Sequence, residues 1–265
     1  MGASSAGRAT SIHALHCGGD VQDWAVFDPL DERAGTGIYN PYFVFVVRHP
    51  SGTVLFDSGA HPDLRTNARE RLGPAADLFD ARLDPDHNVP DLLARLGLAP
   101  RDIDVVVQSH LHFDHAGGLE HLTHAPVYVQ QDELDFAYAP PDDQRDIYVQ
   151  ADFDVGCDWR PLHGDHDLFG DGSVRIVFTP GHTRGHQSLL VRLPSQTVFL
   201  LSDAAYLVDK MRARRLPGVL WTPESMLATW DRVEAIEREE DALLLATHEV
   251  DYETRFRIAP DAWYE

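Results

Sequence analysis

The stretch Ser109-His110-Leu111-His112-Phe113-Asp114-His115-Ala116-Gly117-Gly118 places three histidines and an aspartate within six positions. It directly follows the β-branched run 105–107, which has the character of a buried strand. Residues two apart in an extended segment point the same way, so His110 and His112 can converge on one ion. The aspartate and the third histidine follow where the chain turns, and the two glycines permit a tight turn. Imidazoles with one carboxylate predict a site for a zinc-like divalent metal.

Further candidate ligands lie at the ends of other predicted strands. His182 follows the apolar run 174–178, Asp203 follows the run 197–201, and His248 follows the run 243–245. A lone buried histidine is usually structural, but seven candidates at strand ends predict one shared site. Two closely spaced cations need a bridging anion, and Asp203 is the natural one. The seven candidates are His110, His112, Asp114, His115, His182, Asp203 and His248.

The remaining sequence predicts a single domain over residues 1–265. Residues 1–10 are small and polar, which predicts a disordered tail. Residues 131–170 are aromatic and loop-rich, which predicts a lid-like insertion, with a packed satellite cluster as the alternative. Asp57 ends the predicted strand 53–56, where a carboxylate either orients a metal-bound histidine or caps a turn.

Composition narrows the class of protein. The formal net charge is −21, and Lys210 is the only lysine among 22 basic residues. This acidity argues against nucleic-acid and anionic-membrane partners. The chain shows neither a secretory signal nor an apolar run of membrane-spanning length, so we expect a cytoplasmic enzyme. Cys17 and Cys157 lack metal-site spacing and are predicted to be thiols.

The motifs HLHFDH at 110–115 and TPGHTRGH at 179–186, followed by Asp203 and His248, resemble those of the metallo-β-lactamase superfamily in kind and order. With LFDSG at 55–59 the resemblance extends from residue 55 to residue 249. It implies an α/β fold, a four-layer αββα sandwich with the metals at one edge of the sheets.

Within that superfamily, the N-acyl-homoserine lactonases are the most similar branch. They carry a tyrosine at the position of Tyr206, three residues after Asp203, and Phe113 and GHQSLLV at 185–191 also resemble them. True β-lactamases lack a counterpart of Asp114. A thioesterase like glyoxalase II needs a basic C-terminal anchor, and the segment 251–265 is mostly acidic. A 4-pyridoxolactonase-type enzyme and a glyoxalase II-like thioesterase stay as alternatives.

The resemblance implies a dinuclear metal-dependent lactonase that opens an N-acyl homoserine lactone, as in quorum quenching, by attack of a metal-bridging hydroxide. The metals would be two divalent ions, zinc first, with iron, manganese or cobalt as alternatives. Tyr206 would support the substrate carbonyl oxygen, and Asp114 would take and return a proton. Asp57 and His186 would orient the ligands. One ion would lie between His110, His112 and His182 and the other between Asp114, His115 and His248, with Asp203 as the bridge.

An acyl lactone needs an apolar groove beside the metals. We expect the walls to come from aromatic and aliphatic residues near the motifs: Trp24, Phe27, Phe113, Phe136, Tyr138, Leu207 and Trp221. The partner would be this small molecule alone, and the protein a monomer or homodimer.

Overall fold

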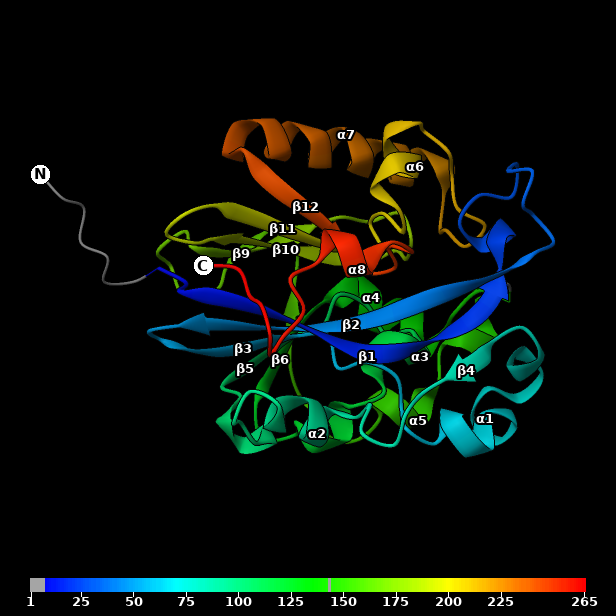
Figure 1. Ribbon diagram of the computed structural model, residues 1–265, viewed down its shortest axis with the longest axis horizontal. Coiled ribbons are helices and arrows are strands. Elements are labelled where there is room, and N and C mark those ends of the chain that lie inside the picture. Colours follow the sequence, from blue (N-terminus) through cyan, green and yellow to red (C-terminus); the bar gives the residue numbers. More distant parts are fainter. Residues whose placement is uncertain (1–7, 143) are drawn as a thin grey trace, which may run out of the picture.

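The computed structural model describes residues 8–142 and 144–265 (Figure 1). Within these residues two β-sheets are stacked face to face, and helices cover both outer faces. The strand order is β4-β1-β2-β3-β5-β6-β7 in the seven-stranded sheet and β12-β11-β10-β9-β8 in the five-stranded sheet. The predicted four-layer αββα arrangement is confirmed.

The two sheets follow one another along the chain. The larger sheet contains β1 (Ser11–Asp23), β2 (Gly37–His49), β3 (Gly52–Phe56), β4 (Asp80–Arg82), β5 (Val105–Val107), β6 (Pro126–Gln130) and β7 (Asp158–Leu162). The smaller sheet contains β8 (His166–Asp167), β9 (Val174–Phe178), β10 (Gln187–Arg192), β11 (Thr197–Ser202) and β12 (Ala242–Ala246). The helices are α1 (Leu64–Leu72), α2 (Val89–Ala94), α3 (Phe113–Ala116), α4 (Gln131–Tyr138), α5 (Gln150–Phe153), α6 (Val208–Arg212), α7 (Pro223–Glu240) and α8 (Tyr252–Arg255).

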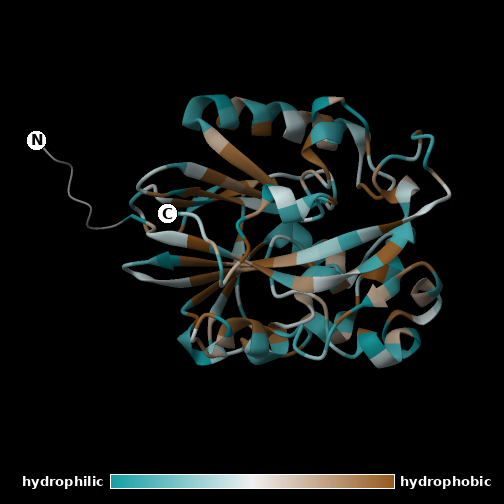
Figure 2. Cartoon of the chain, viewed as in Figure 1, coloured by the Kyte–Doolittle hydropathy of each residue, from teal (hydrophilic) through white to brown (hydrophobic). Residues whose placement is uncertain are grey.

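Strand β2 shows why the layers form. Phe43, Phe45 and Val47 point into the core between the sheets, whereas Val44 and Val46 pack in the separate core beneath α1 and α2. A strand that is buried on both faces reads as a continuous apolar run, because its side chains alternate between two cores. Figure 2 shows this apolar material on the strands and polar residues on the outer helices.

Helix α7 covers the smaller sheet. Thr222 caps it by accepting a hydrogen bond from the Ser225 backbone N–H, and the left-handed Asp241 ends it. Its buried stripe includes Met226, Trp230 and Val233. The Trp230 indole also donates to the Ala204 carbonyl oxygen at 2.7 Å, which anchors the chain just after β11.

Parallel pairing brings the functional loops to one edge. β3 pairs in parallel with β5 in the larger sheet, and β11 pairs in parallel with β12 in the smaller. The carboxyl ends of parallel strands lie at the same edge, so Asp57 meets the loop after β5, and Asp203 meets His248.

The structure corrects the end of the predicted disordered tail. Residues 1–7 of the predicted disordered tail lie outside the described residues. Ala9 is fully buried, and the Thr10 backbone N–H donates to the Arg48 carbonyl oxygen at 2.8 Å, so the chain is already ordered there. Segment 131–170 supplies α4, α5, β7 and β8 to the sandwich, and its role as a lid stays a prediction.

Two further expectations concern cysteines and membranes. Cys17 and Cys157 are both free thiols, as predicted, and Cys17 is buried. Among the described helices, none combines the length and apolar character that a bilayer crossing requires.

Candidate metal centre

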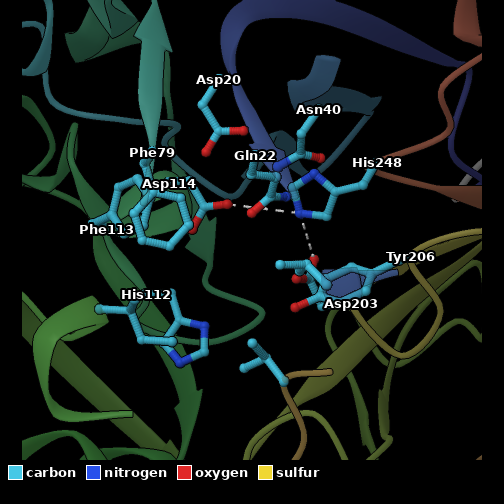
Figure 3. Close-up of a pocket in the computed structure, with 13 residues that line it drawn as sticks. Asp20, Gln22, Asn40, Phe79, His112, Phe113, Asp114, Asp203, Tyr206 and His248 are labelled. Atoms are coloured by element: carbon cyan, nitrogen blue, oxygen red, sulfur yellow. Dashed lines mark ion pairs between the residues drawn. The ribbon is translucent and has the colours of Figure 1, made fainter. Parts of the chain in front are cut away.

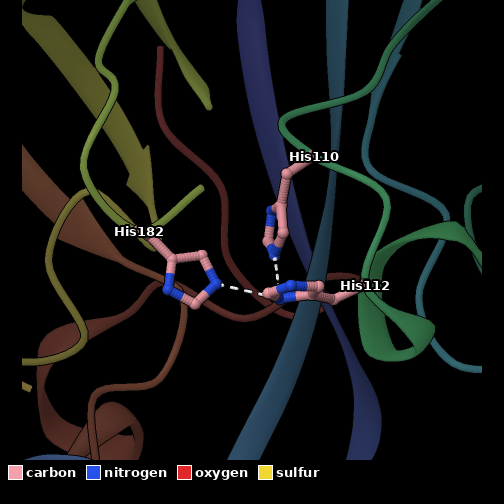
Figure 4. Close-up of side chains that lie close together, drawn as sticks. All are labelled: His110, His112 and His182. Atoms are coloured by element: carbon pink, nitrogen blue, oxygen red, sulfur yellow. Dashed lines mark hydrogen bonds between the residues drawn. The ribbon is translucent and has the colours of Figure 1, made fainter. Parts of the chain in front are cut away.

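Three histidines from two loops converge at the edge of the sandwich (Figure 4). His112 has an extended backbone, with φ and ψ of −67° and 158°, directly before α3 begins. Leu111 points into the core, so His110 and His112 face the opposite way. His112 Nδ1 lies 3.0 Å from His110 Nε2 and 3.0 Å from His182 Nε2.

A second group forms beside the first, from Asp114, His115 and His248. His115 Nε2 lies 3.5 Å from an Asp114 oxygen, and His248 Nε2 lies 3.7 Å from the same oxygen. The potential ligand atoms of this group, like those of the first, all lie within 4.8 Å of one another.

Asp203 lies between the two groups with one carboxylate oxygen toward each. Its Oδ1 is 3.3 Å from His115 Nε2 and 3.2 Å from His248 Nε2, and its Oδ2 is 3.4 Å from His182 Nε2. All seven sequence-predicted candidates therefore meet in one buried cluster, from both sheets.

Hydrogen bonds to backbone groups outside the cluster determine which nitrogen of a histidine ring carries a proton. His248 Nδ1 faces the Pro41 carbonyl oxygen at 2.9 Å, and His182 Nδ1 faces the Val219 carbonyl oxygen at 3.3 Å. A carbonyl oxygen only accepts, so both Nδ1 atoms donate. Both Nε2 atoms face the Asp203 carboxylate, so a positive charge is needed there, which a second ring proton or a metal ion can supply. The donor set therefore fits divalent metal.

Asp57 plays the same part for His115, because it accepts the proton of Nδ1. Its Oδ2 accepts from His115 Nδ1 at 2.9 Å and from the Ser109 hydroxyl at 2.9 Å, and its Oδ1 accepts from the Ser109 backbone N–H at 2.7 Å. The Ser109 oxygen in turn lies 2.9 Å from His110 Nδ1, and Ser202 donates to Asp57 at 3.2 Å. Asp57 is thus placed where a carboxylate can orient two histidines at once.

His186 lies just outside the cluster. Its Nε2 accepts a hydrogen bond from the Asp203 backbone N–H at 3.1 Å, and its Nδ1 faces the Thr179 carbonyl oxygen at 3.2 Å. The ring therefore holds the chain at Asp203 rather than pointing into the ligand groups, the position that the sequence predicted for an orienting residue.

Glu133 on α4 escaped the sequence analysis. It is fully buried and accepts from the Leu111 backbone N–H at 2.9 Å, the Tyr148 hydroxyl at 2.8 Å and the Thr183 hydroxyl. One carboxylate thereby joins the loop of His110 to the loop that carries Thr183. Its only signal in the sequence is an acid at the start of a helix, which is ordinary.

Gly117 and Gly118 allow two loops to approach closely, and neither has a backbone conformation that requires glycine. Gly117 has an ordinary helical φ of −65°, but a Cβ there would overlap the backbone nitrogen of His61. A Cβ on Gly118 would lie 2.5 Å from the Ser58 carbonyl oxygen. The loop after β3 can therefore press against the ligand loop, which brings Asp57 within reach of His115.

Burial and charge set the protonation of the cluster. Burial and the neighbouring imidazoles hold the pKa of His110 well below its ordinary value, so this ring is neutral. Although burial opposes ionisation of Asp203, the surrounding imidazoles, that of His248 foremost, hold its pKa well below the ordinary range. Burial raises the pKa of Tyr206 well above its usual value, so its hydroxyl keeps its proton.

A cavity of about 50 Å³ opens over the cluster (Figure 3). It continues into an outer hollow of about 240 Å³ that shares several of its wall residues. One wall is aromatic, with the rings of Phe79 and Phe113 centred 5.1 Å apart. Another is polar and consists of Asp20, Gln22 and Asn40.

Most of the predicted wall residues lie elsewhere. Phe113 borders the cavity, but the other six are absent from its lining over the described residues. Trp24, Phe27 and Leu207 form a small core that packs behind Tyr206. The remaining three lie in the larger core or at the surface: Phe136, Tyr138 and Trp221.

Tyr206 itself borders the cavity. Its ring centroid lies 5.3 Å from those of His182 and His248, between the two ligand groups, and Phe27 packs edge-on against its other side. Its hydroxyl oxygen lies 3.3 Å from His182 Nδ1. Because that nitrogen donates, the tyrosine oxygen can only accept there, which leaves its own proton available for the cavity.

A two-sheet sandwich with imidazoles and carboxylates gathered at one edge is the architecture of a metal-dependent hydrolase. The chain belongs to the metallo-β-lactamase superfamily, whose family model matches residues 39–248. The resemblance and fold class expected from the sequence are confirmed.

The chain is also similar to individual N-acyl homoserine lactonases. The chain is 35% identical over 238 residues to the N-acyl homoserine lactonase AttM of Rhizobium radiobacter, covering 88% of this chain and 90% of the relative. It is 26% identical over 223 residues to the N-acyl homoserine lactonase AiiA of Bacillus thuringiensis subsp. kurstaki, covering 83% and 86%. A solved N-acyl homoserine lactone hydrolase with N-hexanoyl-L-homoserine at its metal center superposes with a TM-score of 0.85, at 22% identity and covering 96% and 99%.

Proposed function

We propose that the protein hydrolyses N-acyl homoserine lactones at a centre of two divalent ions. The observation that carries the proposal is the placement of Asp203, one oxygen toward each histidine group, beneath a cavity that Tyr206 borders. The similarity to AttM, which covers most of both chains, supports the choice of a lactone as substrate.

We propose that the ligands divide into the two groups that the family resemblance implies. His110, His112 and His182 would hold one ion, and Asp114, His115 and His248 would hold the other, with Asp203 between them. We propose zinc, because neutral imidazoles with few carboxylates suit it. When bound, the ions supply an activated water and polarise the lactone carbonyl.

The residues of the chain contribute binding and proton transfer. The Tyr206 hydroxyl donates a hydrogen bond to the lactone carbonyl oxygen, which stabilises the negative charge that develops there. The Asp114 carboxylate borders the cavity and accepts the proton released by the attacking water. It then returns this proton to the ring oxygen as the ring opens. Asp57 keeps His115 in the tautomer that presents a lone pair.

The acyl tail has a place in the outer hollow. This hollow continues the cavity and is bordered by Val26, Leu78, Phe79, Ile147 and Val219. Burial of a methylene contributes up to about 0.8 kcal/mol, so a longer tail should increase kcat/KM until the hollow is full.

The test is metal analysis followed by a panel of lactones. We expect two divalent ions per chain and ring opening of N-acyl homoserine lactones of graded tail length, with 4-pyridoxolactone and a glutathione thioester as competing substrates. Hydrolysis of the aromatic lactone or of the thioester alone would overturn the substrate assignment. A single ion in fully active protein would overturn the dinuclear scheme. Cytoplasmic location and oligomeric state stay predictions from the sequence.

A further inference from the structure

The polar wall of the cavity contains a buried carboxylate without an evident role. Asp20 on β1 is 1% exposed, and neither of its oxygens makes a hydrogen bond of ordinary geometry to a described residue, although the Tyr42 hydroxyl and the Asn40 side chain lie beside it. A carboxyl group accepts at about four positions when ionised, so even donation from both of these neighbours would leave acceptor positions unused. Such a group is costly to bury unless a ligand supplies a donor.

The neighbours of Asp20 extend the same polar surface. Asn40 lies opposite it on β2, and the Asn40 side-chain oxygen is also buried without a partner among the described residues. Gln22 follows two positions later on β1 and borders both the cavity and the outer hollow. Figure 3 shows Asp20, Gln22 and Asn40 in the upper part of the view toward His248, whereas Phe79 and Phe113 lie on the left beside Asp114.

The proposed substrate has one group that matches this surface. The amide nitrogen of an N-acyl homoserine lactone is attached to the ring carbon next to the reacting carbonyl, and its N–H is the only hydrogen-bond donor of the molecule's head. The inference requires a pose in which the ring lies over the ligand groups, with this N–H toward the polar wall and the acyl carbonyl toward the outer hollow.

We propose that Asp20 accepts a hydrogen bond from the substrate amide N–H, and that Gln22 donates to the acyl carbonyl oxygen. Asp20 is thus a specificity residue that selects lactones with an acylamino group over lactones without one. The inference rests on the proposed function and deepens it. A site built to accept a particular N–H discriminates strongly, because without the donor its buried acceptor is left unpaired.

The test compares two substrates and two forms of the enzyme. One substrate is N-hexanoyl homoserine lactone, and the other is the same lactone with CH2 in place of the amide N–H. We expect metal-loaded wild type to prefer the amide by roughly 10- to 100-fold in kcat/KM, the range for leaving a buried acceptor unpaired. Asp20→Leu should lose that preference by slowing the amide alone, with metal content unchanged.

Two controls separate the contact from general damage. Asp231→Asn removes a carboxylate from an exposed position of α7 and should change kcat/KM for neither substrate. Asp20→Asn keeps the shape and one acceptor oxygen, so it should fold if the leucine variant does not, and should lose part of the preference. Equal losses on both substrates, or no preference in wild type, would overturn the role of Asp20.

Calorimetry at low temperature measures the affinity of metal-loaded protein for each of the two lactones, which tests the same contact without turnover. Tighter binding of the amide form, reduced in Asp20→Asn, supports the inference even if hydrolysis is absent. Absence of hydrolysis of either lactone would instead count against the proposed function. Equal binding of both forms to wild type would overturn the inference.

Discussion

Asp57→Asn tests whether the hydrogen bonds outside the cluster control metal binding. The substitution preserves size, and asparagine tolerates the left-handed φ of 61° at this position. The single amide oxygen must face the Ser109 backbone N–H, which cannot turn away. The amide NH2 therefore takes the place of the oxygen that accepts from His115 Nδ1.

The consequence is a change of tautomer. His115 must now accept at Nδ1, so its proton moves to Nε2, the atom that faces Asp114 at 3.5 Å and Asp203 at 3.3 Å. A protonated Nε2 bonds to these carboxylates and has no lone pair for an ion. Loss of such an orienting partner costs roughly 10- to 100-fold in metal affinity.

The assay is competition for zinc between the protein and a chromogenic chelator at neutral pH. Ser202→Ala is the matched control, because it removes one donor to the same Asp57 oxygen without adding a new one, and should change affinity by less than about 10-fold. If Asp57→Asn bound both ions as tightly as wild type, the tautomer argument would be wrong.

Three further substitutions test other parts of the site. Tyr206→Phe should lower kcat on the best lactone by roughly 10- to 1,000-fold with metal content unchanged, because one oxyanion donor is lost. An unchanged rate would mean that Tyr206 contributes only to packing. Glu133→Gln leaves one acceptor oxygen for the backbone N–H groups of Leu111 and Gly185, so urea unfolding should show a loss of about 1–3 kcal/mol, and equal stability would contradict this. Gly117→Ala should cost about 1–3 kcal/mol in the same assay, since the added methyl group overlaps neighbouring backbone, and a neutral effect would show that the loops can separate.

The candidate ligands were predictable because their signal is local. His110, His112, Asp114 and His115 are joined by a few bonds, and the strand before them determines their direction. His182, Asp203 and His248 were found by the same rule, since each follows an apolar run that ends at the shared edge of parallel strands. Their approach to one another depends only on strand order, which the family resemblance supplied.

The cavity walls were poorly predicted because hydrophobicity does not reveal direction. Trp24 and Phe27 are as apolar as a groove requires, but they pack behind Tyr206. Asp20 was missed for a different reason. Ile12 and Ala14 on β1 face the core between the sheets, and strict alternation would place Asp20 on the same side.

A bulge in β1 reverses this alternation. The register shifts between His16 and Gly19, where Gly18 has a φ of +95°, and Asp20 then pairs with Asn40, two residues from Tyr42 of the outer core. One extra residue thus turns the end of the strand toward the cavity. Because the partner strand determines a bulge, its effect is not visible in the β1 sequence alone.

Because both sheets contribute to one cluster, metal supply should affect how much folded protein a cell contains. Ions shared by ligands from the two sheets would bind only when the halves are docked, so they would stabilise the folded chain by mass action. At a free concentration 1,000 times the dissociation constant, one site contributes about 4 kcal/mol. Scarcity of metal would therefore increase the unfolded fraction that proteases capture, and the abundance of the protein, not only its turnover rate, would follow metal supply.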